Sequence, residues 1–473
     1  MSGTISSLGV GSGLDATSII AKLMEVEQQP IKTLDDQTKA VKTQLSAFGK
    51  LSSTISTFRD AASAMTKGDT WSATKSTSSD ETSVSVAAGN AAPGTYSISA
   101  SQLAQSQTVT SGLVATDAAL GTGTLHITLG TYSSDNSTFT AESGVNAVDV
   151  TIGTGEDSLA TVAAKINKAS AGVTASVVTD LNGSRLVVRS SSTGKDNGFS
   201  ITSTGAAGSG LANLNYDPAN SGATMSLSQP AQNAIANVNG IAIESDSNTL
   251  TGAVEGLSIK LNKATTSPVD ITVEQDDDAI KTKVQAFVDS YNTLNSLFAE
   301  DLKYDPGSKE AGPLQGDRTA VTLQSQFRQM LTGVTTASSK YSRLSDVGLE
   351  VQKDGSLKLN EDKFKAALDG YPADLKLLFA NAGSTTSYST SDGVAQRLRS
   401  LSDEALSFDG SLTMRSQGLQ NQINRNDQRS AELQDRADHT EARLRAQYSA
   451  LDTTLANLNG LSSYVSNQLK ALG

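Results

Sequence analysis

Residues 31–65, IKTLDDQTKAVKTQLSAFGKLSSTISTFRDAASAM, place an apolar side chain at every seventh position: Leu34, Val41, Phe48, Ile55 and Ala62. Residues 444–472, LRAQYSALDTTLANLNGLSSYVSNQLKAL, repeat this spacing with Leu444, Leu451, Leu458, Val465 and Leu472, and with Tyr448, Leu455 and Leu469 beside them. A seven-residue repeat gives a narrow stripe that is typical of a coiled-coil seam and covers too little of a helix to face a broad globular core. We therefore expect both ends of the chain to be helices that pack against each other or against other subunits.

The C-terminal seam is imperfect before Leu444. From Leu412 it continues through Leu419, Ile423, Asn426, Ser430, Leu433, Ala437 and Thr440. Two consecutive four-residue steps, from Thr440 to Leu444 to Tyr448, form a stutter that locally unwinds a supercoil. The polar seam positions weaken this stretch as an isolated coil, so we expect it to gain most of its stability from partners.

The N-terminal helix has a predicted start and a predicted interruption. Asp15 is a good N-cap before Ile19, Leu23 and Val26, which follow helical spacing. Pro30 is expected to interrupt or restart the helix, because proline lacks the backbone N–H that an inner helical position donates.

The middle of the chain changes to the period of two that is typical of strands. Residues 84–86 and 96–100 alternate around a turn at 90–94 and predict a hairpin, and Asn239-Gly240 predicts a two-residue hairpin turn. In DSLATVAAKINKA, residues 157–169, the apolar spacing predicts one amphipathic helix. The segment KDG, residues 353–355, predicts a further turn, with Asn360 as the cap of the next helix.

The predicted fold class is α+β and multidomain, with a helical, coiled-coil stem built from both termini and β-rich head domains inserted into it. The predicted divisions are a terminal leg (1–45 with 431–473), a helical stem domain (46–75 with 276–430), a β-rich head domain (76–101 with 231–275) and an outer β-rich head domain with one helix (102–230).

Composition excludes several classes of function. The net charge of −12 disfavours nucleic acid and anionic lipid, which both bind cationic surfaces. No apolar run is long enough to span a membrane, and the N-terminus lacks the basic and apolar regions of a Sec-type signal. The chain has no cysteine and two histidines, which rules out thiolate chemistry, cysteine-ligated zinc and multi-histidine metal sites.

No motif predicts catalysis, a cofactor or a metal. The glycines at 9, 11 and 13 follow no strand and have the wrong spacing for a dinucleotide site. The acidic run 276–278 lacks the spacing of a calcium loop and precedes a helix, whose N-terminus favours negative charge. His126 lies in an alternating strand, on its expected solvent face, and His439 lies within the C-terminal coil. We therefore expect a protein that is not an enzyme.

Several ordered segments resemble the flagellar filament cap family, which is also called FliD or flagellar hook-associated protein type two. ISSLGVGSGLDATSIIAKLMEVEQQPI (5–31) resembles that family's opening, and VNGIAIESDSNTLTGAVEGLSIKL (238–261) its entry into the C-terminal region. ITVEQDDDAIKTKVQAFVDSYNTLNSLF (271–298) and GPLQGDRTAVTLQSQFRQML (312–331) continue the pattern. Residues 158–202 are similar to a small module of flagellin and hook-associated head domains.

The resemblance implies a non-enzymatic assembly factor at the distal tip of the bacterial flagellum, outside the cell. It implies a homo-oligomeric ring, with a pentamer as the family default, that retains exported flagellin and promotes its folding and insertion. It further implies contact with the hook–filament junction protein before filament growth, export by the flagellar type III apparatus without a cleaved signal, and an export chaperone, FliT, on the last helix, about 430–473.

The residues expected to contact protein partners are those of the two seams: Leu34, Val41, Phe48, Ile55, Leu444, Tyr448, Leu451, Leu455, Leu458, Val465 and Leu469. Two alternatives stay open at this point. One is another axial protein, such as a junction subunit. The other is a tip adhesin whose β head binds host mucin or glycans, which binding tests on the head would separate from a cap.

Overall fold

The structure is a computed structural model that describes residues 15–115, 118–205, 209–220, 223–307, 310–383 and 388–471. It divides into two compact units: a helical unit made of 1–71 and 277–473, and a β unit made of 72–276. Long helices at both ends and a β-rich middle confirm the predicted α+β class. The glycine-rich stretch 9–13 lies outside the described residues.

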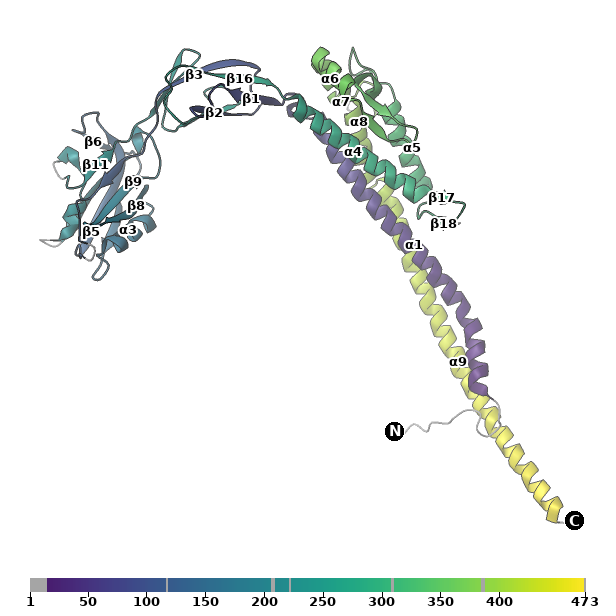
Figure 1. Ribbon diagram of the computed structural model, residues 1–473. Coiled ribbons are helices and arrows are strands. Elements are labelled where there is room, and N and C mark those ends of the chain that lie inside the picture. The colour runs from purple at the N-terminus through teal and green to yellow at the C-terminus, as the bar shows by residue number, and fades with distance from the viewer. Residues whose placement is uncertain are drawn as a thin grey trace. The chain divides into compact units, whose positions relative to one another are not determined.

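Two long helices, α1 (Ala16–Thr66) and α9 (Ser411–Ala471), dominate the helical unit (Figure 1). The shorter helices are α2 (Gly68–Trp71), α4 (Asp277–Leu302), α5 (Arg318–Thr332), α6 (Glu361–Gly370), α7 (Pro372–Ala380) and α8 (Val394–Leu406). Two small hairpins join them, β17 (Tyr304–Asp305) with β18 (Glu310–Ala311), and β19 (Leu349–Val351) with β20 (Leu357–Leu359).

The two predicted caps of this unit are confirmed. The Asp15 carboxylate accepts a hydrogen bond from the Ser18 amide at 3.0 Å, and Asn360 caps α6 by accepting from the Lys363 amide at 3.2 Å. The predicted turn at KDG joins β19 to β20, and Gly355 there has a φ of +83°. A left-handed φ of this kind favours glycine, because a Cβ would be strained.

The predicted interruption at Pro30 is wrong, because α1 continues through it. Pro30 and Val26 both lie on the exposed side of the helix. Water can therefore hydrogen-bond to the Val26 carbonyl, which has lost its helical N–H donor. Buried residues on both sides of the proline, Met24 and Val41 among them, hold the helix across it.

The core of the helical unit is aromatic. The ring of Phe58 on α1 lies 5.4 Å from that of Phe287, 5.8 Å from that of Tyr291 and 5.7 Å from that of Phe327. Burial raises the pKa of Tyr291, whose hydroxyl donates a hydrogen bond to the Gly355 carbonyl at 3.0 Å. This core fixes the C-terminal half of α1 among several helices.

The β unit contains two lobes with separate apolar cores. The inner lobe, residues 72–104 and 231–276, has a five-stranded antiparallel sheet in the order β1 (Thr74–Ser78), β16 (Val269–Gln275), β3 (Gly94–Gln102), β12 (Ala234–Val238), β13 (Ile241–Ser245). A three-stranded sheet of β14 (Thr249–Thr251), β15 (Leu257–Leu261) and β2 (Val84–Ala88) shares its core.

One predicted hairpin of the inner lobe is confirmed and one is wrong. At Asn239-Gly240 both residues have positive φ, +51° and +86°, and the turn joins β12 to β13 with Val238 opposite Ile241. The predicted pairing of 84–86 with 96–100 does not occur, because β2 pairs with β15 and β3 pairs with β16 and β12. The turn at 90–94 carries the chain from one sheet to the other.

The outer lobe, residues 105–230, has two antiparallel four-stranded sheets and a helix. The first contains β10 (Gly198–Gly205), β5 (Gly123–Tyr132), β6 (Phe139–Ala141) and β7 (Val148–Ile152). The second contains β11 (Ser226–Gln229), β4 (Thr108–Thr110), β9 (Gly183–Ser190) and β8 (Val173–Asp180).

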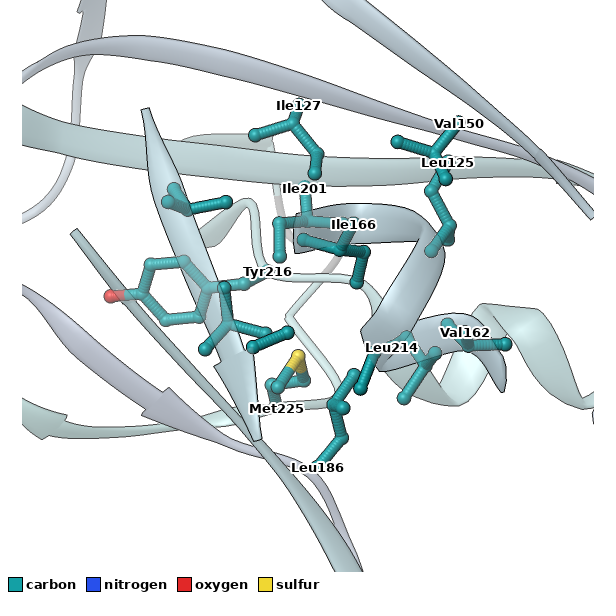
Figure 2. Close-up of a cluster of buried hydrophobic side chains, with 14 of the residues drawn as sticks. Leu125, Ile127, Val150, Val162, Ile166, Leu186, Ile201, Leu214, Tyr216 and Met225 are labelled. Carbon is teal, nitrogen blue, oxygen red and sulfur yellow. The ribbon is translucent and has the colours of Figure 1, made fainter. Parts of the chain in front are cut away.

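The predicted helix of the outer lobe is α3 (Leu159–Lys168), which Ser158 caps by accepting from the Thr161 amide. Val162 and Ile166 of α3 point into the core among side chains from several strands (Figure 2). The burial of Leu159, Val162 and Ile166 along one face of α3 confirms the predicted amphipathic helix.

Candidate functional site: the seam of the terminal helices

The two terminal helices lie side by side and run in opposite directions (Figure 1). Ile20 and Met24 of α1 are buried against Ala437 of α9, with Ile31, Leu444 and Tyr448 packed around them. Further along, Glu27 faces Arg436, and Asp35 accepts a hydrogen bond from Ser430. The start of α1 is therefore paired with α9 near Leu444 and Tyr448.

The structure places the four N-terminal seam residues in two different environments. Leu34 is half-buried and Val41 is buried in the part of α1 that runs along α9. Phe48 and Ile55 have 0% exposed surface, in the part of α1 that α4 and α8 also contact. This second part of the stripe belongs to a bundle core and not to a two-helix seam, in contrast to the expectation for a stripe of this width.

The paired seam contains polar residues on both helices: Asn426, which was an expected polar position, and Thr38, which the seven-residue pattern did not include. Thr38 is buried, and its hydroxyl donates to the Leu34 carbonyl at 2.8 Å. Asn426 lies half-buried on α9, and its Nδ2 is buried without a hydrogen-bond partner. A buried amide donor without an acceptor costs about 1–3 kcal/mol, so this layer weakens the pair.

Residues 449–471 of α9, called the arm below, extend past the paired part of the helix (Figure 1). Leu455 is half-buried, while Leu451 is 44% exposed, Leu458 56%, Val465 48% and Leu469 66%. Exposed leucines are common singly, but a contiguous row of this length marks a contact surface. Of the predicted C-terminal seam residues, the structure brings Leu444 and Tyr448 together with α1 and leaves this row open.

The apolar surface of the arm is wider than a two-helix seam. Leu461 is 64% exposed and Tyr464 63% exposed, and the seven-residue pattern did not include either. At 100° per residue, Leu455 lies about 40° to one side of Leu451, and Leu461 and Tyr464 about 80° and 140° to the other. An arc of this width exceeds the stripe that one partner helix covers.

The density of charged residues changes along α9, and this change, which the sequence alone shows, marks the boundary between the paired part of the helix and the arm. Residues 425–445 contain 10 charged residues in 21, whereas the arm contains two in 23, Asp452 and Lys470. A helix with a solvated face normally has charged residues on that face. The scarcity of charge is typical of a helix that packs on more than one side, and burial of the arm by partners stays a prediction.

The described residues include both histidines of the chain, His126 and His439. They contain no group of three or more His, Asp or Glu side chains that could hold a metal ion. His126 contacts Asp149 at 2.5 Å and Thr204 at 3.1 Å on a partly exposed strand face, and His439 is 82% exposed beside Asp435. Among the same residues, no helix combines the length and the apolar character that a membrane span needs.

Comparison with known families accounts for most of the chain. Residues 12–107 match the family described as Flagellar hook-associated protein 2 N-terminus, and residues 231–460 match Flagellar hook-associated protein 2 C-terminus. Residues 126–192, within the outer lobe, match the Flagellin hook IN motif.

Individual relatives align over nearly their whole length. The chain is 34% identical to flagellar hook-associated protein 2 of Escherichia coli (strain K12), over 99% of this chain and 98% of that protein. It is 29% identical to flagellar hook-associated protein 2 of Salmonella typhimurium, over 99% of both. The fold matches a crystal structure of the D1-D2-D3 domains of the flagellar cap protein FliD from Escherichia coli, with a TM-score of 0.65 and 33% identity, covering 79% of this chain and 99% of that one.

Proposed function

The chain belongs to the flagellar hook-associated protein 2 family and is a flagellar cap protein, and from this premise we propose how its parts serve filament growth. The β unit forms part of a plate that retains exported flagellin subunits at the distal tip while they fold and insert. The terminal helices are legs that hold the plate on the filament through contacts that exchange as each subunit is added. The protein acts by steric and mechanical means, not as an enzyme.

The observation that supports this proposal is the apolar, exposed and nearly charge-free surface of the arm. A helix with this surface gains stability by packing among other helices. The width of the apolar arc favours more than one partner helix, as a leg inserted among filament subunits would have. The half-buried polar layer at Asn426 suits a leg that must release and rebind.

The proposed partners follow from the family and from this surface. They are flagellin, other copies of the chain in a ring (a pentamer by family default), the hook–filament junction protein before growth, and the export chaperone FliT on the last helix. The chain leaves the cell through the flagellar type III apparatus without a cleaved signal. The division into leg, stem domain, head domain and outer head domain at 45, 75, 101, 230, 275 and 430 is part of the same proposal.

The test is Leu451→Asp, which places a charge in the middle of the apolar row. Because Leu451 is 44% exposed, the isolated variant should keep its fold and its circular dichroism spectrum. A charge buried in an apolar contact without a partner is strongly unfavourable, so the legs should fail to hold the cap. Cells with this variant should secrete flagellin monomer into the medium and grow short filaments or none.

The matched control is Ser463→Asp, which adds the same charge on the opposite, polar side of the arm and should support normal filaments. Export of both variants is confirmed by immunoblotting of the medium, and binding of the purified variants to FliT is measured separately because the same helix serves both partners. Normal filaments from exported Leu451→Asp protein would refute the leg mechanism.

A further inference from the structure

The two lobes of the β unit are connected by a narrow ribbon. The chain enters the outer lobe after β3 and returns before β12, and these two segments pair at Gln105 and Gln232 through hydrogen bonds of 2.9 and 3.1 Å. The Gln102 side chain donates to the Asn233 carbonyl at 2.7 Å, and that of Gln232 donates to the Leu103 carbonyl at 3.0 Å. Since the apolar cores of the lobes are separate, this ribbon is the covalent hinge between them.

A second set of contacts joins the lobes beside the hinge. From the outer lobe, the Thr193 hydroxyl donates to the Asp246 carbonyl at 2.7 Å, and the Lys195 amide donates to Asn233 Oδ1 at 2.7 Å. The Lys195 ammonium group lies 2.9 Å from Glu244 Oε1, to which Asn233 Nδ2 also donates at 2.7 Å. We call this set the latch: Thr193 and Lys195 on one side, Asn233, Glu244 and Asp246 on the other.

Gly194 lets the latch close. Its φ is +107°, and its amide donates to the Gln105 carbonyl at 3.1 Å. A Cβ on Gly194 would lie 2.7 Å from the Asp246 Cβ and 2.9 Å from its Cα. Because the obstructing Cα belongs to the backbone, a larger residue would have to push the two sides apart, in addition to its strained φ.

The contacts of the latch are short, but they contribute little to the stability of the closed position. Lys195 is 51% exposed and Glu244 55% exposed in their side chains, and an ion pair in contact with water contributes little net stability. Next to it, a crevice of about 560 Å³ separates the lobes, lined by Gln107, Tyr132 and Lys195 on one side and Gln102, Gln232 and Glu244 on the other. Because each lobe has its own apolar core, opening at this crevice exposes neither core.

We propose that the outer lobe swings as a unit on the paired strands at Gln105 and Gln232, and that the latch holds it in a closed position from which it opens reversibly. Each lobe keeps its own core during the motion. Opening breaks the contacts of Thr193 and Lys195 with the inner lobe and widens the crevice. This inference rests on contacts within the β unit and stands independently of the cap function.

The absence of cysteine in the chain allows a direct test by single-molecule energy transfer. Dyes are placed on the full chain at two exposed positions, Leu181→Cys in the outer lobe and Glu255→Cys in the inner lobe. The unmodified latch should give one dominant, narrow transfer peak. Lys195→Met combined with Glu244→Gln should add a second population or broaden the peak, and Gly194→Val should shift most molecules to the new population.

The matched control is Lys165→Met, which removes an ion pair of similar geometry, Lys165 with Glu156 at 2.5 Å, that lies within the outer lobe alone. It should leave the transfer peak unchanged. Unchanged peaks in both latch variants would show that the ribbon alone fixes the lobes and would overturn the proposal. A transfer peak of the unmodified protein as broad as that of the latch variants would also overturn the proposal, because the latch would then not hold the closed position.

Discussion

The two parts of α9 follow the same seven-residue seam but differ in the charge around it and in its exposure. In residues 425–445 charges cover the outer face, and the apolar side chains pack on α1, with Ala437 1% exposed. In the arm two charged residues remain, and leucines that follow the same repeat are about half exposed. The seven-residue repeat predicts which side of a helix contacts a partner. The charged residues on the other sides indicate how much of the helix surface stays exposed to water.

This difference has a consequence for stability within one chain. Short isolated helices are marginal in water, and most helical stability in proteins comes from packing. The paired part of α9 obtains that packing within its own chain, whereas the arm leaves its apolar side chains exposed and, under the proposed function, obtains packing from other molecules. Mutations should therefore affect the stability of the isolated protein in the paired part and affect assembly in the arm.

The largest expected effect compares two leucines of α9. Leu419 is 1% exposed and Leu458 is 56% exposed. Leu419→Ala should lower the free energy of unfolding of the helical unit by about 2–5 kcal/mol, since it removes a buried side chain and leaves a cavity. Leu458→Ala should change it by less than about 0.5 kcal/mol, as is usual for surface substitutions.

Urea unfolding of the full chain, followed by the helical signal at 222 nm, measures both values. Circular dichroism before denaturation verifies that each variant starts folded. If Leu458→Ala destabilises the isolated protein as much as Leu419→Ala does, the arm is packed within the chain. The proposed difference between the two parts of α9 would then be wrong.

The sequence predicted the helical ends and the β-rich middle because these patterns are local. The seven-residue spacing identified both terminal helices, and the caps at Asp15 and Asn360 were recognisable because a side-chain oxygen has to satisfy a free amide at a helix start. The Asn239-Gly240 turn was predictable because few residues adopt two successive positive φ angles.

The features that the sequence did not predict depend on distant partners. The heptad repeat does not indicate how many helices pack around it. Phe48 and Ile55 therefore matched the pattern of a two-helix seam, although they lie in a bundle core. Strands β2 and β3 are neighbours in sequence, but each finds its partners more than 130 residues away. Pro30 is tolerated because packing on both sides of it outweighs one lost hydrogen bond.

A smaller effect is expected from the polar layer of the paired part. Asn426→Leu removes a buried amide nitrogen that has no hydrogen-bond partner and adds an apolar side chain to the seam. The unfolding free energy should rise by about 1 kcal/mol, near the lower end of the cost of an unsatisfied buried donor. Differential scanning calorimetry should show a higher Tm for the helical transition. Asn424→Leu, at an exposed position two residues earlier, is the control and should leave the Tm unchanged.

The smallest effect concerns the charges that distinguish the two parts of α9. Glu27 and Arg436 form an ion pair between α1 and α9 with 4.0 Å between their charged atoms, and their side chains are 39% and 76% exposed. Glu27→Gln should therefore cost about 0.2–1 kcal/mol at low ionic strength. In 1 M salt, where the screening length falls to about 3 Å, the difference from the unmodified protein should disappear.

Urea unfolding at both salt concentrations measures this difference in unfolding free energy. Glu25→Gln is the control, because Glu25 has no ion pair among the described residues. A cost that persists unchanged in 1 M salt would mean that Glu27 stabilises the pair by packing, and that the charges of this part of α9 serve only its solvation.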